Sequence, residues 1–317
     1  MNLLPRLKLP TLGLGILFLI GAGVVFYILY TSTINLFREK LNEQLLESSF
    51  HAMDKVDRIF YERYLDLKAF ASDPVISSRN AAPEKIEERL KTLQSQSPFY
   101  ASISFFDRNR IKIAGTSPAE MGKEHPLTEY MKGISEGKDF VMGVSESKAV
   151  KDVAFYFASV VREKDGSVLG VVSARMTLET LHDVAKEAVG VHGGRKDVKM
   201  DLVDRDGLLL YSNYNREGIL KERFPDWEYV RNAAAEGKKR EGGAFYRRGI
   251  EDEIHVFAHE PGYRDFAGNG WTLILHVPAK EAVETSLELR IVLLYVGGVI
   301  LVLLAFFFII MLDEKKR

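Results

Sequence analysis

The 317-residue chain contains no cysteine. This absence excludes disulfide bonds, thiolate metal sites and a cysteine nucleophile, but it does not fix the compartment, because many extracytoplasmic proteins have no disulfides. The chain also lacks an excess of charge of either sign. Its formal net charge is −1, so the charge balance provides no basic footprint for nucleic acid. We therefore expect no nucleic-acid partner.

Catalytic motifs are scarce as well. The sequence contains no His-Glu-x-x-His metalloprotease motif and no phosphate-binding loop. A membrane-anchored enzyme acting outside the cell would need a nucleophile or a paired acid and base, and no such pair is evident. We therefore expect that the protein is not an enzyme.

Two long uncharged apolar runs stand out, at residues 11–30 and 291–312. As a helix, each is long enough to cross a hydrocarbon core of about 30 Å. The alternative for the first run is a cleaved signal peptide, but the run is too long and no small-x-small cleavage site follows it. Basic residues precede the first run and follow the second. The positive-inside rule therefore predicts a two-pass protein of the cell inner (plasma) membrane, in contact with lipid, with both termini cytoplasmic and residues 31–290 extracytoplasmic.

Between the two runs, the sequence first predicts helices. From Ile34 to Phe70 apolar residues recur at helical spacing without an intervening glycine or proline, and Asp73-Pro74 ends the pattern. A helix of about 40 residues extends about 60 Å. A second, shorter helix is expected to begin at Pro83 and to carry its apolar residues on one face.

The following region predicts antiparallel sheet. Residues 153–176 have the pattern of a hairpin, because two runs of β-branched, aromatic and small residues flank the turn Lys164-Asp165-Gly166. Neither face of its arms is polar, so we expect both faces to be covered in the middle of a sheet. An earlier hairpin has its turn at residues 107–110.

The same arrangement recurs later in the chain. The turn at residues 204–207 repeats the turn at residues 107–110, and residues 253–277 contain two strand patterns like those of the central hairpin. Gly170 and Gly270 stand at corresponding places, with an offset of 100 residues. These anchors predict that one sheet module is present twice, which is too few copies for a solenoid.

In this order, the long helix and the segments EGKDFVMGV, DGSVLGVVSARMTLETL and GYRDFAGNGWTLILHVPAKEA resemble a double Cache (dCache_1-type) sensor, the extracytoplasmic domain of bacterial signal-transduction receptors. The resemblance covers about residues 34–287. It implies an α+β fold in which a long N-terminal helix carries two tandem PAS-like antiparallel-sheet modules, flanked by two transmembrane helices. It also implies that the membrane-distal module binds a ligand and that the membrane-proximal module passes the signal on.

The resemblance and the apolar runs together divide the chain into eight parts. They are residues 1–10 (cytoplasmic N-terminus), 11–30 (first transmembrane helix), 31–74 (long helix), 75–190 (membrane-distal Cache module), 191–280 (membrane-proximal Cache module), 281–290 (linking helix), 291–312 (second transmembrane helix) and 313–317 (cytoplasmic tail).

Amino-acid-binding members of this family carry a tyrosine, an arginine that clamps the α-carboxylate, a tryptophan-tyrosine pair, a later tyrosine and an aspartate that takes the α-amino group. Laid without gaps on this chain, the pattern marks six candidate ligand-binding residues: Lys123, Thr128, Tyr130, Met131, Glu146 and Arg175. Thr128 replaces the clamping arginine, and Arg175 replaces the aspartate. The resemblance therefore implies that an ordinary amino acid is not the ligand.

Arg175 has two interpretations. Its strand should be covered on both faces, and a buried guanidinium needs an acidic partner, for which Glu146 is the candidate. Alternatively, Arg175 and Lys123 bind a carboxylate or another anion by charge-assisted hydrogen bonds. Both interpretations place Arg175 and Glu146 in one region with Tyr130, where we expect a pocket.

His255 and His259 are a candidate metal pair, because spacing four places both on one face of a strand or a helix. Two imidazoles are suitable ligands for zinc or copper. No third ligand is evident at short spacing, however, and no cysteine is available. We therefore expect neither a metal site nor a cofactor.

These observations favour a membrane-anchored extracytoplasmic sensor that binds a small molecule in the distal module, with a carboxylate or another anionic metabolite as the candidate ligand. Only residues 313–317 follow the second apolar run, too few for a kinase, cyclase or methyl-accepting domain. We therefore expect a homodimer that signals through its transmembrane helices to a separate output protein. The alternatives are a membrane-anchored scaffold that binds another protein, and the sensor half of a longer chemoreceptor, histidine kinase or cyclase.

Overall fold

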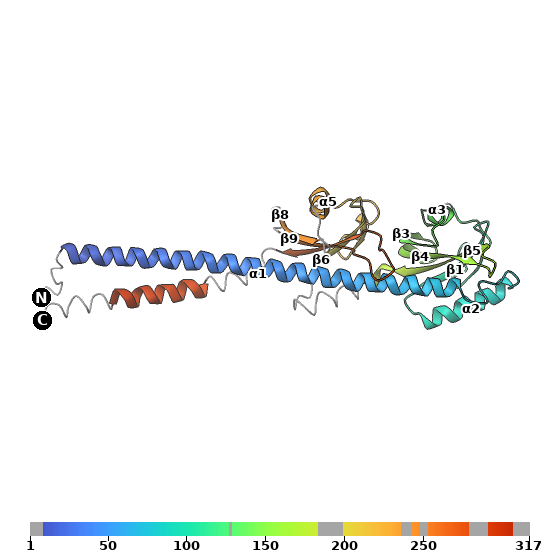
Figure 1. Cartoon of the computed structure of the whole chain (residues 1–317), viewed down its shortest axis with the longest axis horizontal. Coiled ribbons are helices and arrows are strands. Elements are labelled where there is room, and N and C mark those ends of the chain that lie inside the picture. The colour runs from blue at the N-terminus through green and yellow to red at the C-terminus, as the bar shows by residue number, and fades with distance from the viewer. Residues whose placement is uncertain are drawn as a thin grey trace. The chain divides into compact units, whose positions relative to one another are not determined.

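The structure is a computed structural model that describes residues 9–126, 129–182, 199–235, 242–247, 253–278 and 291–306. One long helix, α1 (Leu9–Ala71), precedes two five-stranded sheets (Figure 1). Every strand pair whose register is described is antiparallel. The expected α+β class, with two antiparallel sheets and a long N-terminal helix, is confirmed.

The first module follows α1. Its elements are α2 (Pro83–Gln96), β1 (Ser102–Asp107), β2 (Lys112–Gly115), α3 (Glu129–Ser135), β3 (Phe140–Ser147), β4 (Asp152–Arg162) and β5 (Val168–Thr177). The sheet has the strand order β2-β1-β5-β4-β3. The predicted central hairpin is confirmed, because β4 and β5 pair across a turn in which Gly166 has a φ of +85°. Eight consecutive residues of β4 are buried, as expected for a strand in mid-sheet.

The second module has the same architecture. Its elements are β6 (Lys199–Val203), β7 (Leu209–Ser212), the 3₁₀ helix η1 (Arg216–Gly218), α5 (Trp227–Ala235), β8 (Gly242–Arg247), β9 (Glu253–His259) and β10 (Thr272–Pro278). Its strand order, β7-β6-β10-β9-β8, repeats that of the first sheet strand for strand. The predicted internal duplication is therefore confirmed at the level of topology.

The strand registers correct one detail of the duplication. Phe106 pairs with Lys112 and with Val171 in the first sheet. Val203 pairs with Leu209 and with Thr272 in the second. On the first two strands of each sheet, corresponding residues thus lie 97 positions apart. On β5 and β10 they lie 101 positions apart, so the offset of 100 between Gly170 and Gly270 is wrong by one residue in this part of the sheet.

The two glycines behind that offset have different structural roles. A Cβ at Gly170 would lie 2.0 Å from the carbonyl oxygen of Phe106, so this glycine allows β5 to approach β1 closely. Gly270 has a φ of +74°, a conformation that side chains with a Cβ rarely adopt. Two unrelated requirements for glycine therefore produced the near match in the sequence.

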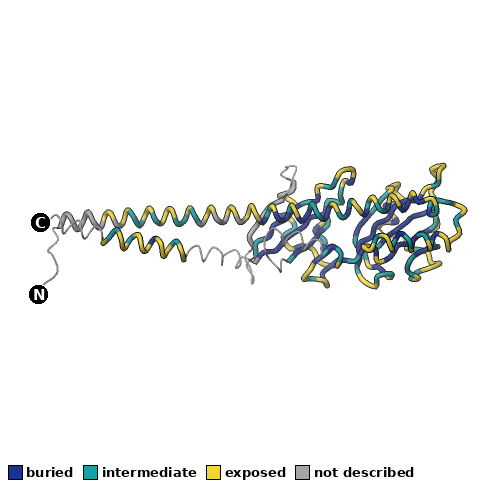
Figure 2. The backbone as a smooth tube through the Cα atoms, turned by 90° about the horizontal axis from the view of Figure 1, so that it is seen from below, coloured by how far each residue is buried: buried dark blue, intermediate teal, exposed yellow. Residues whose placement is uncertain are grey.

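The later half of α1 supplies core residues for both sheets. The Phe60 ring is completely buried, and its centroid lies 5.5 Å from that of Phe155 on β4 and 5.3 Å from that of Trp271 beside β10. Figure 2 shows the buried positions concentrated along the strands and on part of this helix. The long predicted helix thus lies within α1, and its apolar stripe becomes core.

The flanking residues 1–45, 246–254 and 277–317 belong to a separate compact unit. Residues 291–306 are helical, and the ring of Phe26 lies against Gly297. Within the described ranges, no helix meets the combined length and hydropathy needed to cross a membrane. The predicted linking helix at 281–290 lies outside the described residues.

Candidate functional site

A cavity of about 170 Å³ lies on one face of the first sheet. Its floor is made by alternate residues of two neighbouring strands, because alternate side chains of a strand point to the same face. Ser104 pairs with Ser173, and Ser102 pairs with Arg175. The polar cavity floor is therefore a direct consequence of the register between β1 and β5.

Arg175 is half-buried in this floor. Its Nη1 donates a hydrogen bond to Oγ of Ser173 over 3.1 Å, and its guanidinium lies 5.4 Å from the ring centroid of Tyr156, its partner on β4. The expectation that both faces of β5 are covered thus holds for its apolar centre but not at Arg175, where one face opens into the cavity. The guanidinium remains accessible to a ligand.

Lys112 on β2 is the second cation of the cavity. Its side chain is almost fully buried, and its Nζ donates hydrogen bonds to the carbonyl oxygens of Ser117 (2.7 Å) and Ala119 (2.8 Å). Burial lowers the pKa of Lys112; the carboxylate of Glu120 opposes this shift, and the positive charge of Arg175 adds to it. An ammonium has three donors, so these two bonds leave one N–H for a ligand.

The other charged groups of the lining mostly compensate one another. Lys123 and Lys148 lie 3.4 Å and 3.5 Å from the carboxylate of Glu120. Glu124 forms an ion pair with Arg110. Burial lowers the pKa of His125 and so disfavours the charged form of this cavity residue. The carboxylates of Glu120 and Glu124 thus pair with exposed cations at the rim, whereas Lys112 and Arg175 lie in the more buried part of the lining.

The structure places the six predicted site residues in different surroundings. Lys123, Glu146 and Arg175 all line the cavity. Met131 on α3 lies in a hydrophobic cluster with Phe106 and Tyr156. Tyr130 is part of α3, but its side chain lies outside the described set, as does Thr128 altogether. The ion pair between Glu146 and Arg175 stays a prediction.

Lys112 was missed by the sequence interpretation. The sequence did contain a signal, because this lysine stands between Ile111 and Ile113 in a strand pattern. In a half-buried strand, such alternation places the charged residue on the face opposite to the two isoleucines.

A second overlooked pattern is Gly133–Gly137, which has the Gly-x-Ser-x-Gly spacing of hydrolase nucleophiles. Ser135 ends helix α3, and its Oγ donates to the carbonyl of Lys132 over 2.7 Å. It therefore lacks the strand-to-helix turn that a nucleophile elbow requires.

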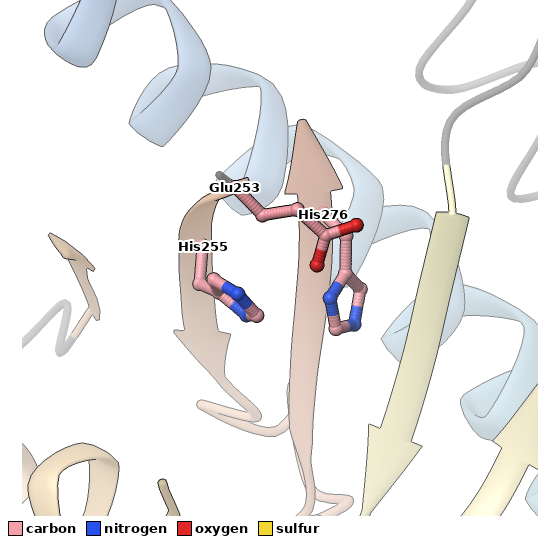
Figure 3. A group of neighbouring side chains, drawn as sticks. All are labelled: Glu253, His255 and His276. Atoms are coloured by element: carbon pink, nitrogen blue, oxygen red, sulfur yellow. The ribbon is translucent and has the colours of Figure 1, made fainter. Parts of the chain in front are cut away.

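The second module contains a cluster of two histidines and a glutamate (Figure 3). His255 on β9 and His276 on the neighbouring strand β10 are buried, and their ring centroids lie 4.6 Å apart. His259, the predicted partner of His255, instead contacts Oγ1 of Thr272 through its Nδ1 over 2.6 Å. The histidine pair that the structure brings together is thus 255 and 276.

His276 is oriented by a buried carboxylate. Its Nε2 lies 2.9 Å from Oδ2 of Asp201, and the hydroxyl of Tyr214 donates to the same oxygen over 2.7 Å. This geometry suits the tautomer in which Nε2 of His276 donates its proton to the carboxylate. In the neutral imidazole, Nδ1 is then the atom with a lone pair.

A buried carboxyl pair connects α1 with the second module. Asp57 on α1 is buried, and neither of its oxygens accepts a hydrogen bond of standard geometry within the described part of the chain. Glu260 follows β9, and its Oε2 accepts from the backbone N–H of Asn269 and of Trp271. Burial and the neighbouring Glu260 raise the pKa of Asp57 to about 8, and burial also raises the pKa of Glu260.

Comparison with known proteins identifies relatives. The family model described as Cache domain (dCache_1) matches residues 33–286. No curated protein sequence matches this chain. Among solved structures, the ligand-binding domain of the Pseudomonas fluorescens chemoreceptor CtaA, in complex with L-serine, has 18% identity and a TM-score of 0.57, covering 77% of this chain and 99% of that one.

Two further structures show the same fold. The ligand-binding domain of the Pseudomonas aeruginosa chemoreceptor PctC, in complex with GABA, has 15% identity and a TM-score of 0.55 over 75% of this chain and 100% of that chain. An extracellular ligand-binding receptor from Desulfohalobium retbaense has 16% identity and a TM-score of 0.56. That match covers 72% of this chain but only 39% of the receptor, so this chain matches well under half of that protein's length.

Proposed function

This chain belongs to the Cache domain family, and we propose that it is the sensor domain of a membrane-anchored receptor. We further propose that its first module binds a small anion and that this anion is a carboxylate. The binding site is the cavity above β1 and β5, with Arg175 and Lys112 as the anion-binding groups. A sensor works by shifting an equilibrium between two conformations, so the ligand need only bind one of them more tightly.

The observation that carries this proposal is the pairing of two partly desolvated cations in one cavity. The positive charge of Arg175 contributes to the lowered pKa of Lys112, which means that the two groups repel each other in the empty cavity. An anion between them would relieve that repulsion and accept charge-assisted hydrogen bonds from both. The serines of the floor offer further hydrogen bonds.

The cavity volume favours a very small ligand. An engineered protein cavity of about 150 Å³ holds benzene, and the cavity of this chain measures about 170 Å³. Sites for drug-sized ligands are larger, at about 300–1,000 Å³. The ligand that fits best is therefore a short carboxylate rather than a long or bulky one.

The lining also disfavours an α-amino acid. A ligand ammonium needs a carboxylate or carbonyl acceptor, and the position that supplies an aspartate in amino-acid-binding relatives holds Arg175. Glu120 and Glu124 are already engaged with cations of the protein, and Glu146, the third carboxylate of the lining, is the proposed partner of Arg175. We therefore propose a carboxylate without an α-amino group.

The test is calorimetric titration of the purified full chain with short mono- and dicarboxylates, and with amino acids for comparison. We expect Arg175→Gln to abolish binding. The matched control is Arg162→Gln on β4, an exposed arginine that pairs with Asp139 and does not line the cavity. Normal carboxylate binding by a folded Arg175→Gln protein, or binding of amino acids alone, would reject the proposed site.

The membrane anchor is part of the same proposal. What supports it is the exposure of large apolar side chains in α1, such as Leu17, Tyr27 and Leu29, and in residues 291–306. The described part of the second apolar run is shorter than the run itself. Reporter fusions at Leu9 and Arg317 should both report a cytoplasmic location; an external signal from either fusion would refute the two-pass topology.

The expected homodimer and the separate output protein remain predictions. We propose that two copies associate in parallel along α1, so that ligand binding changes the spacing of their membrane helices. The chain has no native cysteine, so single cysteines introduced between Leu41 and Ile59 give cross-links without background. Cross-linking restricted to one helical face is expected, together with co-purification of an output protein from native membranes. A chain that is monomeric and purifies alone would favour the scaffold alternative.

A further inference from the structure

We propose that the second module holds one divalent transition-metal ion, zinc or an ion of similar ligand preference, between His255, His276 and Glu253. Each of these residues offers one ligand atom, and the three atoms lie within 4.8 Å of one another. Figure 3 shows the three side chains turned toward one another. Glu253 and His255 are two residues apart on β9, so both project from the same face of that strand.

The donor set suits this class of ion. Imidazole nitrogen and carboxylate oxygen bind zinc at about 2.0–2.2 Å, and in a tetrahedral site their atoms lie about 3.4 Å apart. In the structure the three ligand atoms lie within 4.8 Å of one another, so binding of the ion would draw them closer together. Calcium and magnesium prefer sites made of oxygen alone, so they do not fit a cluster with two imidazoles.

Asp201 and Tyr214 give His276 the orientation of a metal ligand. Histidines that bind a metal through one nitrogen commonly donate the other N–H to a carboxylate, which fixes the ring and raises its basicity. Here Nε2 of His276 lies 2.9 Å from Oδ2 of Asp201, and the hydroxyl of Tyr214 donates to the same oxygen and lies 3.3 Å from Nε2. With Nε2 directed at Asp201, Nδ1 is the ligand atom that His276 offers to the ion.

The charge of the cluster points the same way. Asp201 is buried and Glu253 is half-buried, so two carboxylates lie beside the two imidazoles. Carboxylates beside metal-binding imidazoles favour a cation, both as direct ligands and as groups that orient the rings. Three protein ligands leave a fourth position for water or for a ligand of the ion. This site is separate from the cavity of the first module, and neither depends on the other.

The alternative is that the two rings only pack against each other and against Phe224, whose ring centroid lies 5.8 Å from that of His255. Metal titration of the full chain distinguishes a metal site from simple packing of the rings. The chain is first stripped with a chelator and dialysed. Zinc chloride is then titrated against a chromophoric chelator, and cobalt(II) is added separately, because tetrahedral cobalt has an intense visible spectrum.

We expect one tightly bound zinc per chain and a tetrahedral cobalt spectrum. His276→Gln should abolish both, and Glu253→Gln, at a half-buried position where the fold is least affected, should weaken zinc binding at least about tenfold. The matched control is His259→Gln, a histidine of the same strand that contacts Thr272 and lies outside the cluster. Its zinc affinity should equal that of the unaltered chain.

Asp201→Asn tests the positioning role. Loss of the carboxylate that orients His276 should weaken zinc binding about 10–100-fold while the bound cobalt keeps its tetrahedral spectrum. If zinc binds no more tightly to the unaltered chain than to folded Glu253→Gln, the proposal is wrong. The proposal is also wrong if His276→Gln, Glu253→Gln and Asp201→Asn all retain the ion, or if the unaltered chain binds no zinc.

Discussion

The two modules place different chemistry at one position of the same sheet. The strand registers make Arg175 of the first module equivalent to His276 of the second. Each lies against a ring on the neighbouring strand, Tyr156 in one case and His255 in the other. The repeated backbone thus repeats the location of a site, whereas the side chains decide what the site can bind.

The neighbours of that position also differ in charge between the modules. Ser104 corresponds to Asp201, and Lys112 corresponds to Leu209. The second module therefore has a carboxylate where the first has a hydroxyl, and it lacks the cation of Lys112. Lys199 of the second module takes the place of Ser102 and adds a cation beside His276. The two proposals thus assign an anion to the position held by a guanidinium, and a metal ion to the position where an imidazole lies close to a carboxylate.

The largest effect should come from the residue that both modules share. Phe60→Ala removes a fully buried ring that packs against Phe155 and Trp271, and we expect a loss of about 3–5 kcal/mol in the free energy of unfolding. Denaturant unfolding, with hydrogen exchange of each sheet, measures it. The exposed Leu65→Ala on the same helix serves as the control. Destabilisation of one sheet alone would show that the two modules do not share a core.

The second-largest effect should come from introducing a carboxylate into the first cavity. Ser104→Asp gives the first cavity the group that the second module has at the equivalent position, and it opposes a bound anion by like-charge repulsion. We expect carboxylate affinity to fall about 100-fold, which is about 2.7 kcal/mol. Ser104→Asn keeps the size without the charge and should retain most of the binding. Equal effects of the two substitutions would mean that space, not charge, controls this cavity.

The attachment of the modules to α1 differs in its response to pH. Asp57 contacts the second module through Glu260, and its pKa is raised to about 8, whereas in an unfolded chain it is about 3.9. The folded state therefore holds this proton more tightly, so the stabilisation is fully present below about pH 4 and is lost as the pH rises through about 8. The first module is tied to α1 by a hydrogen bond from Tyr100 to Asp66 instead.

We therefore expect hydrogen exchange in the second module to increase between pH 6 and 9 by more than the intrinsic effect of pH. The expected increase corresponds to a loss of about 2 kcal/mol in the free energy of unfolding of this module. Asp57→Asn should remove this excess. Asp54→Asn changes an exposed carboxylate that pairs with Arg58 and raises the pKa of Asp57 less than burial and Glu260 do, so most of the excess should remain. An equal increase in both modules would contradict the assignment to this carboxyl pair.

The smallest effect separates two lysines of the first cavity. Lys112→Gln should weaken carboxylate binding about tenfold, because it removes a charge-assisted hydrogen bond of about 1.4 kcal/mol or more. Lys123→Gln should have little effect, because Lys123 is exposed and lies close to Glu120. The reverse order would favour Lys123, the residue that the sequence pattern marks as the anion contact.

Much of the fold follows from local patterns. The central hairpin, the helix beginning at Pro83 and the repeated turns were all predicted from residues close together in the chain, and the structure confirms them. Apolar periodicity and turn chemistry act over a few residues, so they can be read without knowing the tertiary structure. The family pattern additionally marked Arg175, which does line a cavity.

The juxtapositions that define both sites arise only in three dimensions. Lys112 and Arg175 meet across 63 residues of sequence, and His276 reaches His255 rather than the nearer His259 because β9 and β10 are neighbours in the sheet. Strand register depends on bulges and on loop lengths, and the duplication shows this directly, since corresponding residues lie 97 positions apart on one strand and 101 on another. The sequence alone therefore determined which residues form strands and helices, whereas tertiary pairing decided which charges face each other, because a shift of one residue turns a side chain to the opposite face of the sheet.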